Sequence, residues 1–121
     1  MIHHVTRKVP PNLLDACITF YGILAYLPIP TPPTLSGRAV WLEHRRARQH
    51  VHLMPEHGAQ PEAGHMALVC ADYEATLDAL ALAAHEVERR QEHWGSPRSH
   101  VHDPAGNLVE LIARPPGESR Q

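Results

Sequence analysis

The most constraining feature of this sequence is a pattern of expected elements that occurs twice. Residues 2–9 and 65–70 have strand-like periodicity, and each run is followed by a turn signal and then by a helical pattern. Three short extended segments follow each helical pattern. Each half of the chain is therefore expected to be a β-α-β-β-β module, which places the fold in the α+β class.

The expected module boundaries follow from this repeat. A segment rich in Pro, Gly and Glu separates the two halves and is predicted to be a linker. At 121 residues, the chain has room for one compact domain that contains both modules. The expected parts are a first module at 1–54, a linker at 55–63, a second module at 64–114 and a frayed tail at 115–121.

Two helices are expected, at 13–24 and 73–84, with Asn12 and Asp72 as their N-caps. The residues expected on their buried faces are Leu14, Ile18, Tyr21, Leu24, Leu77, Leu80 and Ala84. The segments expected as strands after the helices are 26–30, 38–43, 49–54, 85–89, 98–102 and 108–113.

Charge and cysteine content narrow the class of function. Lys and Arg number 11 and Asp and Glu number 13, so no basic field argues for a nucleic-acid partner, and a small-molecule substrate is favoured. The two cysteines lack CxxC spacing and no secretory leader pattern is present, which predicts a cytoplasmic, reduced protein. No apolar run approaches the ~20 residues that span a bilayer, so no membrane association is expected.

Histidine is unusually frequent, with eleven in the chain. Four of them lie in polar or loop-like contexts and are expected to be solvated: His44, His57, His85 and His93. The other seven lie in strand-like stretches: His3, His4, His50, His52, His65, His100 and His102.

The repeat relates four polar positions to one another. Aligning the first strands places His4 on His65, and aligning the last strands places His52 on Glu110. His52 follows His4 by 48 residues and Glu110 follows His65 by 45, a difference that one longer loop absorbs. Neighbouring strand residues point to opposite faces, so His4 is expected in the site, and His3 on the helix-covered face or at its solvent edge.

The chemistry of these four residues favours a metal site. Imidazole and carboxylate together suit a divalent transition metal, and open positions would leave room for substrate oxygens. Each histidine taken alone is more typical of a surface or satisfied core residue. Their equivalence under the repeat is what favours one shared site.

The turn at 103–107 has a structural explanation. Pro104 fixes φ, Gly106 permits positive φ and Asp103 caps local amides, so the segment can join two antiparallel strands. Its expected effect is to fix the register that directs Glu110 toward the site.

Four stretches carry a family resemblance: HHVT at the start, ITFYGILAY on the first helix, GHMALV opening the second half and HDPAGNLVELI closing it. Together they resemble the vicinal oxygen chelate superfamily of glyoxalases, extradiol dioxygenases, fosfomycin-resistance transferases and bleomycin-resistance proteins. The resemblance implies paired βαβββ modules that form an incomplete barrel around a metal and substrate cleft, usually in a homodimer.

The resemblance also implies site residues. His4, His65 and Glu110 match the metal-ligand positions, and His52 occupies the fourth position, where glyoxalase I enzymes generally carry Glu. Because only one Glu remains at the four positions, lactoylglutathione lyase activity itself is not the expected reaction. Fosfomycin-resistance enzymes share the His, His, Glu triad matched by His4, His65 and Glu110, and a Thr that matches Thr6. They also carry a basic C-terminal extension, which places that activity low among the expectations. Common extradiol dioxygenases share the triad but have four modules rather than two.

The function expected from these residues is that of a metalloenzyme acting on a small, oxygen-bearing substrate, with isomerase or lyase chemistry first and dioxygenation second. The expected cofactor is a divalent Zn, Ni, Mn, Fe or Co ion, with His4, His52, His65 and Glu110 as its expected ligands. Glu110, His100 and His102 are the candidate catalytic residues. Thr6, His50, Trp41 and Arg98 are expected to shape the pocket. The alternative is a metal-free binding protein of the bleomycin-resistance type.

Overall fold

The structure is a computed structural model that describes residues 1–117; the last part of the expected tail, 118–121, lies outside the described residues. The chain divides into two compact units. The first comprises Met1–Pro61 with Pro104–Gly106, and the second comprises Glu62–Asp103 with the chain from Asn107 onward.

Within the part of the chain that the structure describes, each unit contains one α-helix and one four-stranded sheet, so the α+β expectation is confirmed. The first unit holds β1 (His4–Val9), η1 (Pro11–Leu13), α1 (Leu14–Ile23), β2 (Leu27–Ile29), η2 (Pro33–Leu35), β3 (Val40–His44) and β4 (Gln49–Pro55). The second unit holds β5 (His65–Val69), α2 (Tyr73–Leu82), β6 (Val87–Arg90), β7 (Arg98–His102) and β8 (Leu108–Ile112).

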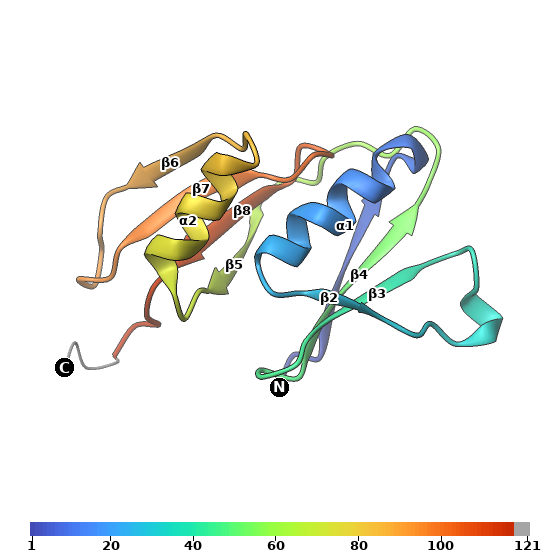
Figure 1. Ribbon diagram of the computed structural model, residues 1–121, viewed down its shortest axis with the longest axis horizontal. Coiled ribbons are helices and arrows are strands. Elements are labelled where there is room, and N and C mark those ends of the chain that lie inside the picture. Colours follow the sequence, from blue (N-terminus) through green and yellow to red (C-terminus); the bar gives the residue numbers. More distant parts are fainter. Residues whose placement is uncertain (118–121) are drawn as a thin grey trace. The chain divides into compact units, whose positions relative to one another are not determined.

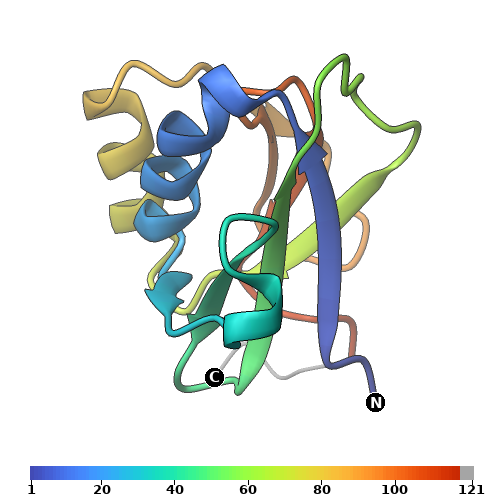
Figure 2. The same ribbon diagram turned by 90° about the vertical axis from the view of Figure 1, so that its right-hand side faces the viewer.

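The two sheets have the same topology. Their strand orders are β1-β4-β3-β2 and β5-β8-β7-β6, with the first and last strands of each unit parallel and the other pairs antiparallel. Both sheets are therefore mixed and open. In Figures 1 and 2, α1 lies along one face of its own sheet, and α2 in Figure 1 occupies the corresponding place in the second unit.

The cores lie between each helix and its sheet. Alternation in β5 buries Met66 and Leu68 while His65, Ala67 and Val69 are exposed, which confirms the predicted faces. Val109 and Leu111 on β8 are fully buried, as expected. Neither helix within residues 1–117 is long and apolar enough to cross a membrane.

The helix expectations are wrong for Asn12 and Ala84, whereas the N-cap position of Asp72 is confirmed. Asn12 lies within η1, which begins directly after Pro10, and Leu13 takes the N-cap position of α1 without a side-chain cap. Asp72 does occupy the N-cap of α2, but its backbone carbonyl, rather than its side chain, accepts hydrogen bonds from Thr76. Ala84 lies beyond the end of α2 with φ of 66° and is exposed, because the chain reverses there.

The buried face of α1 is also rotated relative to the expectation. Cys17 and Phe20 are fully buried with Tyr21, whereas Leu14 and Ile18 are only half-buried. With Leu24, the buried residues follow the i, i+3, i+4, i+7 spacing of one helical stripe. The sequence has a second apolar stripe on this helix, and tertiary packing selects between the two.

The turn between β7 and β8 has the expected construction. The Asp103 carboxylate accepts hydrogen bonds from the backbone and side-chain amides of Asn107, and the backbone closes the loop through Asp103 N–H and Asn107 C=O. Gly106 has φ of 90°, and a Cβ there would lie 2.8 Å from Pro61. Only glycine fits this turn.

Candidate functional site

The sheet registers make the four predicted ligands equivalent in pairs. Thr6 on β1 lies opposite His52 on β4, and Ala67 on β5 lies opposite Glu110 on β8. His4 lies two residues before Thr6 on β1, and His65 lies two residues before Ala67 on β5. We call His4 and His52 the first half-site, and His65 and Glu110 the second half-site.

His52 lies between two other rings in the first half-site. Its imidazole stacks on His4, with ring centroids 4.1 Å apart, and on Trp41 of β3, with centroids 4.5 Å apart and planes within 4°. Trp41 lies directly opposite His52 in the sheet register. The stack leaves His52 only 7% exposed.

Burial and neighbouring histidines control the charge of His52. Desolvation is the largest cause, followed by His4, His50 and His3, and together they lower the pKa of His52 to about 4. The imidazole is therefore neutral near pH 7. Its Nε2 lies 3.1 Å from Nδ1 of His50, whose own Nε2 lies 3.4 Å from a carboxylate oxygen of Glu43.

His3 is exposed rather than covered by the helix, so of the two places expected for it the helix-covered face is wrong. Its ring centroid lies 4.4 Å from that of His50, and its Nδ1 lies 3.0 Å from Nδ1 of His4. β1 begins at His4, so the alternation of strand side chains does not govern His3. His3 therefore joins the histidines around the first half-site.

Glu110 is the centre of the second half-site. Its side chain is only 10% exposed, and Oε1 lies 3.0 Å from Nε2 of His65. Oε2 accepts a hydrogen bond from Nε of Arg98, at 3.3 Å. Burial of a carboxylate is costly without such partners, so Arg98 and His65 explain how Glu110 is accommodated.

Arg98 also orients His100, which lies opposite Glu110 in the register. The guanidinium donates to Nε2 of His100 at 3.3 Å and to the carbonyl of Gln91 at 2.7 Å. Burial lowers the pKa of His100, the charges of Arg90 and Arg98 lower it further, and Glu110 opposes them. Nε2 of His100 is therefore an acceptor, and the other ring nitrogen carries the proton of the neutral form.

The donor chemistry of the two half-sites fits a divalent metal ion, but their geometries differ. Donors bound side by side at about 2.1 Å from one ion lie roughly 3 Å apart, and His65 Nε2 and Glu110 Oε1 have that spacing. His4 and His52 lie face to face within 15° of parallel, so their in-plane lone pairs do not converge. Within residues 1–117, no group of three or more His, Cys, Asp or Glu is placed to hold a metal.

A cavity of about 260 Å³ adjoins the first half-site. Its apolar lining is Leu35, Ala39, Trp41 and Met54, and its polar lining is His4, Thr6, Arg38 and His52. Of the expected pocket residues, Thr6 and Trp41 line this first-unit cavity. His50 lies beside His52, and Arg98 contacts Glu110.

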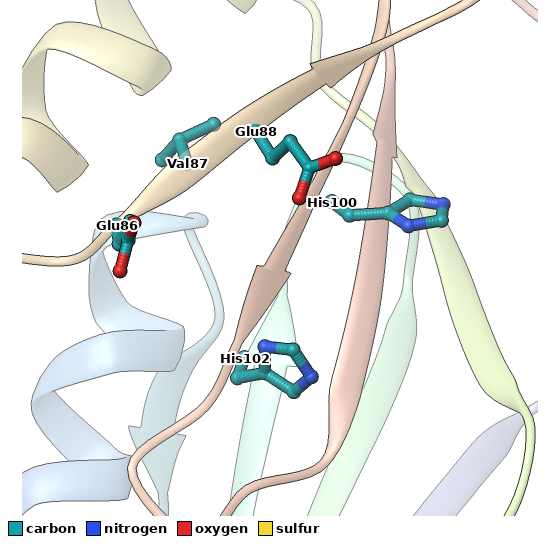
Figure 3. Close-up of a pocket in the computed structure, with 5 residues that line it drawn as sticks. All are labelled: Glu86, Val87, Glu88, His100 and His102. Carbon is teal, nitrogen blue, oxygen red and sulfur yellow. The ribbon is translucent and has the colours of Figure 1, made fainter.

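A larger cavity, of about 600 Å³, lies in the second unit. Figure 3 shows its lining side chains from β7 and from β6 and the residue before it: His100, His102, Glu86, Val87 and Glu88. Sequence reasoning anticipated the two histidines but missed the two carboxylates. Their Glu-Val-Glu alternation in an expected strand was the signal available for them.

Comparisons with known proteins identify the fold. No protein-family model matches the sequence, and no curated protein matches it. Among solved structures, a protein from Bacillus anthracis described as of the glyoxalase family is 25% identical, with a TM-score of 0.81 over 93% of each chain. The chain has the vicinal oxygen chelate fold.

Two further structures with this vicinal oxygen chelate fold show its range. Lactoylglutathione lyase from Agrobacterium tumefaciens is 23% identical, with a TM-score of 0.69 over 93% of this chain and 92% of the other. A bleomycin resistance determinant encoded on the transposon Tn5 is 17% identical, with a TM-score of 0.65 over 89% of this chain and 94% of the other. The vicinal oxygen chelate fold is thus shared by an enzyme and a resistance protein.

Proposed function

We propose that this chain is a metal-dependent enzyme of the vicinal oxygen chelate superfamily that acts on a small, oxygen-bearing substrate. Isomerase or lyase chemistry is the first candidate and dioxygenation the second. The observation that carries the proposal is the second half-site, where a buried carboxylate and an imidazole lie with donor atoms 3.0 Å apart. The repeat supplies His4 and His52 at the equivalent positions.

The proposed ligands are His4, His52, His65 and Glu110, and the proposed ion is divalent Zn, Ni, Mn, Fe or Co. When bound, such an ion would supply Lewis-acid polarisation of a substrate oxygen. Because His4 and His52 are stacked, ligation by both would require one ring to rotate out of the stack. We further propose that the functional form is a homodimer, which sedimentation analysis would test.

Two histidines of the second-unit cavity are proposed to handle protons and hydrogen bonds. His100 accepts from Arg98 through Nε2, so its Nδ1–H is the group that can donate to a substrate. His102 is exposed in the cavity, and its side chain forms no hydrogen bond or ion pair with any residue from 1 to 117. His102 is therefore the better placed general acid or base.

A metal-free binding protein of the bleomycin-resistance type is the second candidate. The first-unit cavity favours it, because Trp41 and three apolar side chains line a space suited to a planar ligand. Absence of metal binding together with tight binding of a planar ligand would select this function over the first.

The deciding experiment measures bound metal by mass spectrometry after the protein has been equilibrated with Zn, Ni, Mn or Fe. The test variant is His65→Ala with Glu110→Ala. The matched control is Glu92→Ala with His93→Ala, which removes the same two residue types from exposed positions of the second unit. We expect wild type and control to retain metal and the test variant to lose it. Wild type that holds no more metal than the test variant would contradict the proposal.

A further inference from the structure

The lining and the volume of the first-unit cavity together indicate which kind of ligand it can bind. Four of its eight lining residues are apolar or aromatic: Leu35, Ala39, Trp41 and Met54. Its volume of about 260 Å³ is below the ~300 Å³ at which pockets for drug-sized ligands begin, so it suits a single small ring.

The charge of this cavity comes from one side chain. Among residues 1–117, Arg38 is the only permanently charged residue in the lining, and none of the lining residues is a carboxylate. The Arg38 guanidinium is exposed and forms no hydrogen bond or ion pair with any residue from 1 to 117. An arginine that has no protein partner beside an apolar cavity can form a two-point contact with a carboxylate.

The remaining polar groups favour a carboxylate over a phosphate. A phosphate group is usually met by several donors, such as clustered cations or the backbone amides of a helix N-terminus. Within the described part of the chain, the lining offers one guanidinium, the Thr6 hydroxyl and the Trp41 indole N–H as non-imidazole side-chain donors, and only the guanidinium is charged. Two oxygens of a single carboxylate would use the guanidinium fork and leave the apolar wall for the rest of the ligand.

We propose that the first-unit cavity binds a small planar carboxylate, with its anionic group on Arg38 and its ring against Trp41. A small planar carboxylate would be the substrate class of the proposed enzyme. Only its turnover rests on the proposed function, because binding in this cavity needs no metal. The second-unit cavity differs, because Glu86 and Glu88 line it (Figure 3), Glu88 pairs with Arg90, and none of its lining residues from 1 to 117 is an arginine that could hold the same anion.

The test uses three planar probes of nearly equal shape and different charge: benzoate, benzamide and benzamidine. They are titrated into EDTA-treated Trp94→Phe protein, in which Trp41 is the remaining tryptophan and reports binding by fluorescence. The Trp41 indole signal in the NMR spectrum of the wild-type protein provides a second readout that does not depend on the Trp94 substitution. We expect benzoate to bind about tenfold or more tightly than the other two probes.

Variants of two arginines complete the experiment. Arg38→Ala should weaken benzoate binding about tenfold and abolish its advantage over benzamide, while Arg38→Lys should retain part of that advantage. Arg46→Ala, which removes an exposed arginine between β3 and β4, should change neither. Equal affinities for the three probes, or benzoate binding within twofold of wild type in Arg38→Ala, would overturn the inference. Because metal is absent, failure here is separate from failure of the metal experiment.

Discussion

The two units place different chemistry on the same backbone. At the proposed ligand position on the last strand, the first unit has His52 and the second has Glu110, and the residue opposite is Trp41 in one and His100 in the other. Two residues before these, the first unit has Ala39 and the second has Arg98. The side chains around the central residue therefore differ between the units in the same way as the central residue itself, His52 or Glu110.

The difference shows two solutions to the burial of a polar side chain at one position. His52 is neutral near pH 7, so ring faces can cover it without supplying a counter-charge. Glu110 carries a carboxylate, and an arginine with two histidines lies around it. Polar groups are tolerated in a protein interior when their hydrogen-bonding or charge is matched, and each unit meets this condition differently.

The largest expected effect tests whether the two cores are equivalent. Leu53 and Leu111 follow His52 and Glu110 directly, and both are fully buried. Leu53→Ala and Leu111→Ala should each lower the free energy of unfolding by about 2–5 kcal/mol, because each leaves a cavity against its helix. Urea denaturation measures this. A loss below about 1 kcal/mol in only one variant would break the equivalence.

Removal of Arg98, which lies beside Glu110, should have the next largest effect on the free energy of unfolding. Arg98→Met leaves a nearly buried carboxylate without its strongest partner and should cost about 3 kcal/mol of unfolding free energy. Arg89→Met is the matched control, because it breaks an exposed pair with Glu74 and should leave stability unchanged within error. Equal effects of the two substitutions in thermal and urea denaturation would contradict the proposed role of Arg98.

Placing the Glu and Arg of the second unit at the corresponding positions of the first unit should have a smaller effect on the free energy of unfolding. His52→Glu places a carboxylate where the first unit has no counterpart of Arg98, and should cost about 2 kcal/mol. Addition of Ala39→Arg, at the position that corresponds to Arg98, should recover about 1 kcal/mol. A double variant no more stable than the single variant would show that the two environments are not interchangeable.

The smallest effect concerns the two cysteines, one in each unit. Burial raises the pKa of the Cys70 thiol from 9.0 to about 11, which lowers its thiolate fraction at pH 8 roughly a hundredfold. Cys17 is fully buried. Neither should react with a disulfide reagent in the folded protein within the time that labels both in urea. Rapid labelling of folded Cys70→Ala or Cys17→Ala would identify an accessible thiol.

The order and type of the elements follow from local patterns, which is why the sequence predicts them. Alternation identified β5 and its faces, and Pro104 and Gly106 identified the turn before β8. Features set by tertiary packing could not be predicted from the sequence in the same way. The choice between two apolar stripes on α1 depends on the sheet beneath it, and the pair of prolines before α1 replaced the expected cap at Asn12 with a 3₁₀ turn.

The equivalence of the four candidate residues was likewise predictable from the repeat, but their contacts were not, and their role as one site stays a prediction. The repeat relates His4 to His65 and His52 to Glu110, and the registers agree with it. The stack of His52 between His4 and Trp41 and the ion pair of Arg98 with Glu110 depend on rotamers and cross-strand neighbours. Periodicity assigns a face to a side chain but does not assign its partner.

The most direct test of the two half-sites is X-ray diffraction at a metal absorption edge, from crystals grown with Ni²⁺ or Zn²⁺. We expect one anomalous peak per chain, with donors of His4, His52, His65 and Glu110 within about 2.3 Å of the ion. A peak held instead by other residues, such as His3 and His50, or crystals that contain the metal without a peak at these four side chains, would contradict this expectation.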